Sequence, residues 1–374
     1  MHRFANIYRL GIKELWSLAR DPMMLVLIAY TFTYSIYVAA TAMPDTLHNA
    51  AIAIVDEDGS QLSARIVSAF EPPRFRTPQL VSLSEMDHGM DAGDYTFVLD
   101  IPPDFQRDVL AGKQPVAQLN VDATRMSQAF TGSTYIQEIV AAEVTEFVKR
   151  YRAETVLPVD LAPRMRFNPN LMQAWFGALM ELINNVTMLS IILTGAALIR
   201  EREHGTVEHL LVMPVTPAEI MLAKVWSMAL VVLGAATFSI VFIVQGALQV
   251  PIEGSVAVFL FGAALHLFAT TALGIYLATL ARSMPQFGML LILVLIPLQM
   301  LSGGVTPRES MPAVVQDLML AAPTTHFVSA AQAVLYRGAG LDVVWPQYLA
   351  IVAIGAVFFA IALARFRKTI TLMA

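Results

Sequence analysis

The chain has 374 residues, of which 56% are hydrophobic and 14% charged, and its mean hydropathy is +0.61. Soluble domains have about a quarter of their residues charged, so this composition excludes an ordinary soluble protein and predicts a membrane protein. The absence of cysteine excludes disulfide bonds and thiolate metal sites.

Residues 1–22 are predicted to form a helix in the cytoplasmic membrane interface. The apolar residues that favour this arrangement lie largely along one helical side and are Phe4, Ile7, Leu10, Ile12, Leu15, Trp16 and Leu18. Residues 23–43 then form an apolar run of the roughly 20 residues that cross a bilayer. A signal peptide is the alternative, since residues 40–42 read Ala-Thr-Ala. The apolar stretch of a signal peptide is about 7–15 residues long, which is shorter than the run at residues 23–43. We therefore expect an uncleaved first transmembrane helix.

Residues 44–174 change in composition, with 18 Asp and Glu against 11 Lys and Arg, a net charge of −7. Three strands are expected, at 50–56, 95–102 and 115–123, and three helices, at 60–70, 103–112 and 124–151. This alternation predicts an α/β domain between the first two spans, placed in the periplasm. Its acidic balance gives no basic footprint for nucleic acid. Residues 56–60, Asp-Glu-Asp-Gly-Ser, fail the EF-hand spacing and are expected to form an exposed turn. We expect the domain to contact a partner or a substrate in transit; a spacer is the alternative.

Five further apolar runs bring the expected number of transmembrane helices to six, at 176–199, 220–247, 256–281, 286–301 and 345–364. In the first of these, Glu181, Asn184 and Asn185 share one helical face. Because a carboxylate in hydrocarbon is costly, this face is a candidate for the translocation path or a dimer seam. The alternative is that Glu181 reaches lipid headgroups or water.

The distribution of Lys and Arg predicts that both termini are cytoplasmic. Six spans place the following residues on one side: Arg3, Arg9, Lys13, Arg20, Arg200, Arg202, Lys224, Arg282, Arg365, Arg367 and Lys368. Outside residues 44–174, the opposite side has Arg308 and Arg337. An odd number of spans would break this segregation.

Residues 200–223 are a short polar segment between two apolar runs. The second span is expected to continue as helix through the charged run Arg-Glu-Arg-Glu-His and to end at Gly205. Thr216-Pro217-Ala218-Glu219 has the pattern of a capping box with proline at the first helical position, which predicts the start of the third span. A stiff segment bearing surface charge and joined directly to two spans is suited to being pushed by a soluble partner.

At these residues the chain resembles type 2 ABC exporter permeases, bacterial inner-membrane proteins of multidrug-efflux type. The family's cytoplasmic loop reads approximately R-E-x-E-x-G-T-x-E-x-L-x-x-x-P-x-x-x-x-E-x-x-x-x-K. The matching positions are Arg200, Glu201, Glu203, Gly205, Thr206, Glu208, Leu210, Pro214, Glu219 and Lys224. Residues 20–22, 95–123 and 301–338 are also similar to family segments, so the resemblance covers nearly the whole chain. The chain departs from the family's usual residues at Met213, Val215 and Gly304.

The resemblance implies that the loop 200–223, from Arg200 to Pro214 above all, docks on an ABC ATPase subunit. It implies that residues 302–338 dip into the outer leaflet as a re-entrant segment, and that two permease chains pair, as a homodimer or with a related chain. The large domain implies, as further partners, a periplasmic adaptor protein and an outer-membrane channel. Membrane lipid surrounds the spans. The substrate is left open.

No P-loop pattern occurs, because Gly112-Lys113 lacks the upstream glycine and the following hydroxyl residue. We therefore expect a transport subunit that is no enzyme and holds no cofactor or metal itself, with ATP and Mg²⁺ on the partner. His204 and His209 have the wrong spacing for a zinc protease. An ion-driven carrier and a membrane-anchored periplasmic scaffold are the alternative functions.

Overall fold

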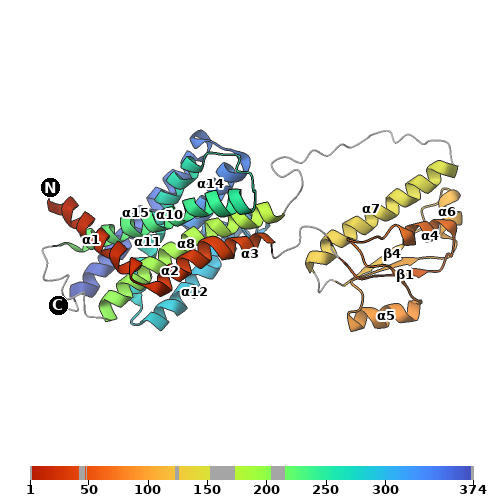
Figure 1. The fold of residues 1–374 in the computed structure, drawn as a ribbon, viewed down its shortest axis with the longest axis horizontal. Coiled ribbons are helices and arrows are strands. Elements are labelled where there is room, and N and C mark those ends of the chain that lie inside the picture. The colour runs from red at the N-terminus through yellow and green to blue at the C-terminus, as the bar shows by residue number, and fades with distance from the viewer. Residues whose placement is uncertain are drawn as a thin grey trace. The chain divides into compact units, whose positions relative to one another are not determined.

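The computed structural model describes residues 2–41, 47, 49–122, 126–151, 173–203 and 215–371. The chain separates into two compact units, drawn as ribbons in Figure 1. One consists of Met1–Met43 and Met165–Ala374 and is called the membrane unit here. The other, Pro44–Arg164, is called the sheet domain.

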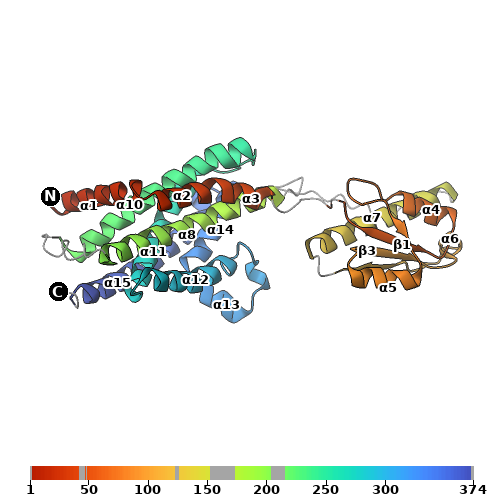
Figure 2. The same ribbon diagram turned by 60° about the horizontal axis from the view of Figure 1, so that its bottom comes forward.

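The membrane unit consists of helices with both ends of the chain at one end of the bundle (Figures 1 and 2). In chain order these are α1 (His2–Ala19), α2 (Pro22–Tyr30), η1 (Thr31–Ser35), α3 (Ile36–Thr41), α8 (Gln173–Glu203), α10 (Pro217–Phe238), η2 (Ser239–Ala247), α11 (Val256–Leu280), α12 (Met284–Met300), η3 (Arg308–Ser310), α13 (Ala313–Met319), α14 (Pro323–Arg337) and α15 (Leu341–Thr371). The segments η1 and η2 are π-helical, and η3 is a 3₁₀ turn.

Five of the described helices are long and apolar enough to cross a membrane, namely Pro22–Thr41, Ala174–Glu203, Pro217–Ala247, Val256–Leu280 and Leu341–Lys368. The expected fifth span is α12, which contains Pro297 and has only 17 residues, so it is shorter than a standard span. The segment after it forms the bent pair α13 and α14, whose axes differ by 89°. Such a bend is the geometry expected of a re-entrant segment. If the pair counts as one span, the candidate spans number six.

Helix α8 is the central helix of the bundle. In its most apolar window 83% of the residues are buried, against 22–50% in the other candidate spans. It packs directly on α11, where Ser190 donates a 2.6 Å hydrogen bond to Thr270, and the Thr187 hydroxyl lies 2.9 Å from Nε2 of His266. Small and hydroxyl-bearing residues let membrane helices approach closely and hydrogen-bond across the contact.

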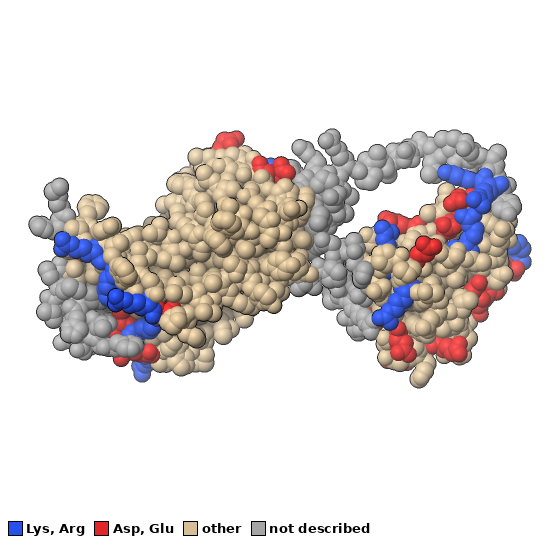
Figure 3. All heavy atoms as spheres, viewed as in Figure 1, with Lys and Arg blue, Asp and Glu red and all other residues tan. Residues whose placement is uncertain are grey.

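Helix α1 packs on α10, and its apolar residues divide between two directions. Gly11, Glu14 and Leu18 are buried, whereas Phe4 and Trp16 are exposed. The expected continuous apolar stripe is therefore partly used inside the protein. The remaining exposed aromatic side chains suit contact with lipid. Figure 3 shows Lys and Arg gathered at this end of the membrane unit, whereas the middle of the unit is largely uncharged on the face seen.

The sheet domain is a four-stranded mixed sheet in the order β2-β1-β3-β4. Its strands are β1 (Ile52–Asp56), β2 (Gln79–Leu80), β3 (Phe97–Ile101) and β4 (Gln118–Val121). Strand β1 runs parallel to β2 and β3, and β4 is antiparallel to β3. The helices α4 (Gln61–Ser68), α6 (Phe105–Leu110) and α7 (Met126–Tyr151) cover one face, and α5 (Leu83–Ala92) covers the other (Figure 1).

The three strands and three helices predicted for this domain are all present. The turn predicted at residues 56–60 is also present, with the Asp56 carboxylate accepting from the backbone N–H groups of Asp58 and Gly59. Two elements were not predicted. Strand β2 has two exposed residues, and α5 is rich in acidic residues with a weak apolar face, although Ser82 and Glu85 form a capping box that could have indicated its start.

Candidate functional site

Four charged side chains meet at the end of the membrane unit that carries both termini. The Nζ atom of Lys224 on α10 lies 2.7 Å from Oε2 of Glu201 on α8 and 3.0 Å from Oε1 of Glu14 on α1. The Nζ atom of Lys13 lies 2.8 Å from Oε1 of Glu201. These four residues are called the charge cluster here, and they join α1 to α8 and α10, which lie far from it in the sequence.

Three members of the charge cluster are shielded from water. The Lys224 side chain is 2% exposed, Glu14 7% and Glu201 11%, whereas Lys13 is 48% exposed. Burial raises the pKa of the Glu14 carboxyl, and the positive charge of Lys224 opposes this shift. A charge buried in this way is tolerated because each partner supplies a compensating charge, so removal of any one buried member leaves an uncompensated charge.

The start of α10 places Lys224 in this cluster. Thr216 is the N-cap, Pro217 follows it, and Glu219 completes the capping box. Oε2 of Glu219 accepts from the backbone N–H of Thr216 at 2.6 Å, and the Thr216 hydroxyl accepts from the N–H of Glu219 at 3.3 Å. This confirms the predicted start of the third span, and it fixes Lys224 two turns into the helix, opposite the last turn of α8.

The last described turn of α8 contacts five other helices. Glu201 belongs to the charge cluster with α1 and α10. Arg200 forms an ion pair with Asp21, whose carboxylate also accepts from the N–H of Met24 and so caps α2. Successive residues of a helix point about 100° apart, so four consecutive side chains reach all sides of the helix.

The remaining two residues of this turn bind the facing ends of α11 and α12. Arg202 donates to the carbonyl oxygens of Ala278 and Ala281 at the end of α11. Oε1 of Glu203 accepts from the backbone N–H of Met284, the first residue of α12, at 3.0 Å. Helix ends leave backbone groups without intrahelical partners, and these two side chains satisfy some of them. We call residues 200–203 the α8 hub.

The α8 hub changes the interpretation of Arg200, Glu201 and Glu203. From the sequence we expect their charges on the surface of the docking loop, whereas in the structure all three side chains bind other helices of the same chain. The other predicted docking residues, Gly205, Thr206, Glu208, Leu210 and Pro214, lie outside the described residues, as does the expected helix break.

The polar face of α8 binds the first span. Glu181 accepts a hydrogen bond from the Ser35 hydroxyl, and Nδ2 of Asn185 donates to the carbonyl oxygen of Thr31 at 2.9 Å. Both partners lie in the π-helical segment η1. Asn185 is buried, and Glu181 and Asn184 are half-buried. These contacts are helix–helix hydrogen bonds, and the prediction of a translocation path or dimer seam at these residues stays a prediction.

A protein-family model described as "ABC-2 family transporter protein" matches residues 22–364. The chain belongs to the ABC-2 transporter family. It is 64% identical, over the full length of both chains, to a protein of Escherichia coli (strain K12) named inner membrane transport permease YhhJ. It is also 28% identical to the probable multidrug ABC transporter permease YbhR of the same strain, over 98% of this chain and 100% of that one.

Membership of the family, together with the apolar helices, identifies the chain as a transporter permease and a multi-pass protein of the inner membrane. Permeases of this family normally work with an ATPase subunit and pair as dimers. The α8 hub lies at the start of the segment that joins α8 to α10, and Lys224 follows the end of this segment, so the ion pair between Glu201 and Lys224 ties the two ends together.

Proposed function

We propose that this permease is the membrane subunit of an exporter driven by ATP hydrolysis on a separate ABC ATPase, which docks on residues 200–223. The observation that carries the proposal is the α8 hub. A push on a loop moves a transporter only if the loop is rigidly connected to several membrane helices. Residues 200–203 provide that connection to α1, α2, α10, α11 and α12.

The mechanism follows from this connection. Closure of two ATPase subunits around ATP would move the docking loop, and the α8 hub would transmit the movement to the ends of α11 and α12. The charge cluster would keep α1 and α10 moving with α8. ATP and Mg²⁺ would bind the partner, since this sequence lacks a P-loop. A second permease chain would complete the path.

The direction of transport and the orientation are also part of the proposal. The distribution of Lys and Arg supports cytoplasmic termini and a periplasmic sheet domain, which could then meet an adaptor protein and an outer-membrane channel. The names of the relatives include multidrug permeases, which supports export of drug-like compounds.

Single cysteines in this cysteine-free chain test orientation and docking together. In spheroplasts, a membrane-impermeant thiol reagent is expected to label Asp91→Cys on α5 and to leave Glu208→Cys unlabelled. In inside-out vesicles Glu208→Cys is expected to react, and co-expression of the ATPase should protect it. Ser17→Cys on the exposed side of α1 is the matched control and should react with or without the ATPase.

Two results would contradict the proposal. Labelling of Glu208→Cys in spheroplasts would show that this loop faces the periplasm, where a cytoplasmic ATPase cannot reach it. Equal reactivity of Glu208→Cys with and without the ATPase would remove the docking site from this loop.

A further inference from the structure

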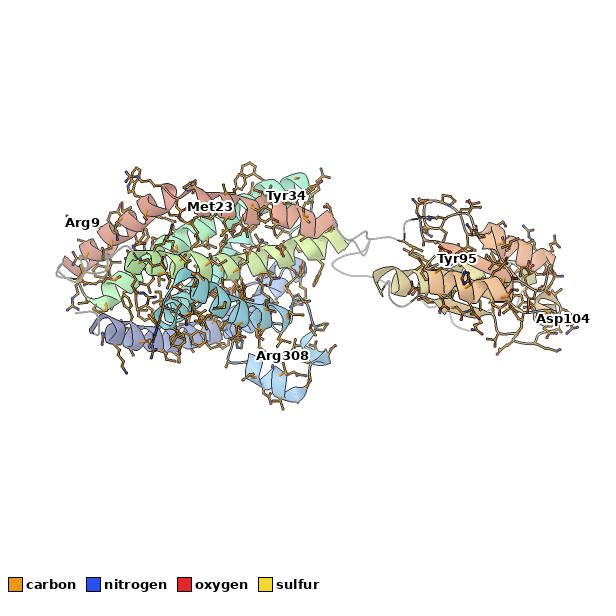
Figure 4. All side chains as sticks on the ribbon, turned by 90° about the horizontal axis from the view of Figure 1, so that it is seen from below. Arg9, Met23, Tyr34, Tyr95, Asp104 and Arg308 are labelled. Carbon is orange, nitrogen blue, oxygen red and sulfur yellow. The ribbon has the colours of Figure 1, made fainter. Side chains whose placement is uncertain are left out.

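A cavity of about 760 Å³ lies at the end of the membrane unit opposite the charge cluster. Its walls come from the start of α8, the segment 302–309 after α12, the helix α14, and α15 near Pro346. Figure 4 labels Arg308 in this region and Arg9 at the other end of the unit. The polar groups of this cavity are not used by the coupling mechanism.

Among the described residues at this end of the membrane unit, the positive charges lie in this cavity. From residue 225 to residue 364 the sequence has Arg282, Arg308 and Arg337 as its Lys and Arg residues. Arg282 precedes α12 at the end where the α8 hub lies, and both Arg308 and Arg337 line the cavity. Within the described residues, neither guanidinium forms an ion pair with a carboxylate. Glu309 also lines the cavity, so two guanidinium groups face one carboxylate.

Three buried polar atoms on the cavity walls have no hydrogen-bond partner among the described residues. They are Nε of Arg308, Oγ1 of Thr325 and Oε1 of Gln347. Thr325 is only 4% exposed. Buried polar groups are normally paired, and an unpaired one is destabilising by about 1–3 kcal/mol, so three on one cavity indicate that a polar ligand or ordered water completes them.

The rest of the cavity lining is mixed, with the polar side chains of Ser302, His326, Ser329 and Gln332 beside apolar ones. The apolar part of the lining includes Phe176, Val305, Val328 and Ala350, and the Val305 side chain is 60% exposed at the surface. A ligand that fits this combination has an anionic polar head for the arginines and hydrogen-bonding groups, and an apolar tail for the adjoining surface.

We propose that this cavity binds the anionic head of an amphiphile, with Arg308 and Arg337 as its counter-charges and Thr325 and Gln347 as hydrogen-bonding partners. The inference is independent of the ATPase proposal, since it concerns the opposite end of the membrane unit. The shared chemistry is a phosphate or carboxylate group, carried either by a lipid headgroup or by a free anion.

Binding of dioctanoyl phosphatidylglycerol to the full-length protein in a neutral detergent tests the proposal, with dioctanoyl phosphatidylcholine and inorganic phosphate as comparison probes. Arg308→Gln and Arg337→Gln are each expected to weaken binding of the phosphatidylglycerol about tenfold, because each removes a charge-assisted hydrogen bond. Arg337 is exposed at the end of α14, so we expect Arg337→Gln to fold normally. This variant therefore tests the proposal even if Arg308→Gln fails to fold. Glu309→Gln is the matched control of opposite sign and should tighten binding.

The probes separate the two sources of the anion. Phosphatidylglycerol that binds more tightly than phosphatidylcholine, and is not displaced by millimolar phosphate, assigns the site to a lipid headgroup. Displacement by millimolar inorganic phosphate would assign the site to a free anion and would overturn the assignment to an amphiphile. Equal binding of the two lipids that neither arginine variant changes would overturn the proposal, and so would weaker binding by Glu309→Gln.

Discussion

Lys224→Met is expected to destabilise the permease by about 3–5 kcal/mol, the usual effect of removing one partner from a buried ion pair. The substitution keeps a side chain of similar length but removes the buried positive charge that lies between Glu14 and Glu201, so Lys13 is the remaining cation of the charge cluster. Thermal unfolding in a mild detergent, followed by size-exclusion chromatography, measures the effect. We expect a large loss of folded protein at growth temperature.

Two variants show whether the effect arises from the charge cluster. Lys13→Met removes a half-exposed member and should destabilise by no more than about 1 kcal/mol. The double variant Lys224→Met with Glu14→Gln also removes one of the uncompensated carboxylates. Its loss of unfolding free energy should be smaller than the sum of the losses in the two single variants. Additive effects, or a Lys224→Met variant as stable as wild type, would show that the cluster does not hold the three helices together.

Gly274→Leu is expected to separate α8 from α11 and to destabilise the fold by about 1–3 kcal/mol or more. A Cβ atom at Gly274 would lie 2.7 Å from the carbonyl oxygen of Ile191, a backbone atom that cannot move without its helix. Gly274→Ala should already be destabilising, and Gly274→Leu more so. Thermal unfolding of the two variants in the same detergent gives the comparison.

Gly234 on α10 is the matched control, because a Cβ atom there meets nothing within 4 Å. Gly234→Leu should leave the unfolding temperature unchanged or raise it, since leucine favours a helix more than glycine does. Equal effects at Gly274 and Gly234 would contradict a close packing of α8 on α11.

Local signals allowed the sequence to predict much of the fold. The capping residues Thr216, Pro217 and Glu219 determine the start of α10 without any tertiary contact, and the structure has the helix where they place it. The apolar runs likewise located the five long candidate spans, since their length alone distinguishes them. Strand β2 and helix α5 escaped prediction because their sequences carry little apolar periodicity, and their positions depend on the sheet beside them.

The α8 hub could not be predicted, and the reason is geometric. The sequence shows Arg200 to Glu203 as four adjacent charges, a pattern typical of a solvated surface. What distinguishes these four residues is the direction in which each side chain points. That direction depends on helices far away in the sequence, as in the hydrogen bond from Lys13 to Glu201, which joins residues 188 positions apart. The sequence does place suitable partners on the same side of the membrane in the expected topology. These are two cations and two anions, namely Lys13, Lys224, Glu14 and Asp21. The sequence does not show which of them pairs with which residue of the α8 hub.

We propose that an ABC ATPase drives this permease through residues 200–223. Purification of the permease in mild detergent with a co-expressed ABC ATPase subunit tests this proposal, with wild type compared with Glu208→Arg. Asp91→Arg, a charge reversal in the sheet domain, is the control. We predict that wild type and Asp91→Arg retain the ATPase and that Glu208→Arg loses it while staying folded. Absence of the ATPase from the wild-type preparation, or its retention by Glu208→Arg, would contradict the claim.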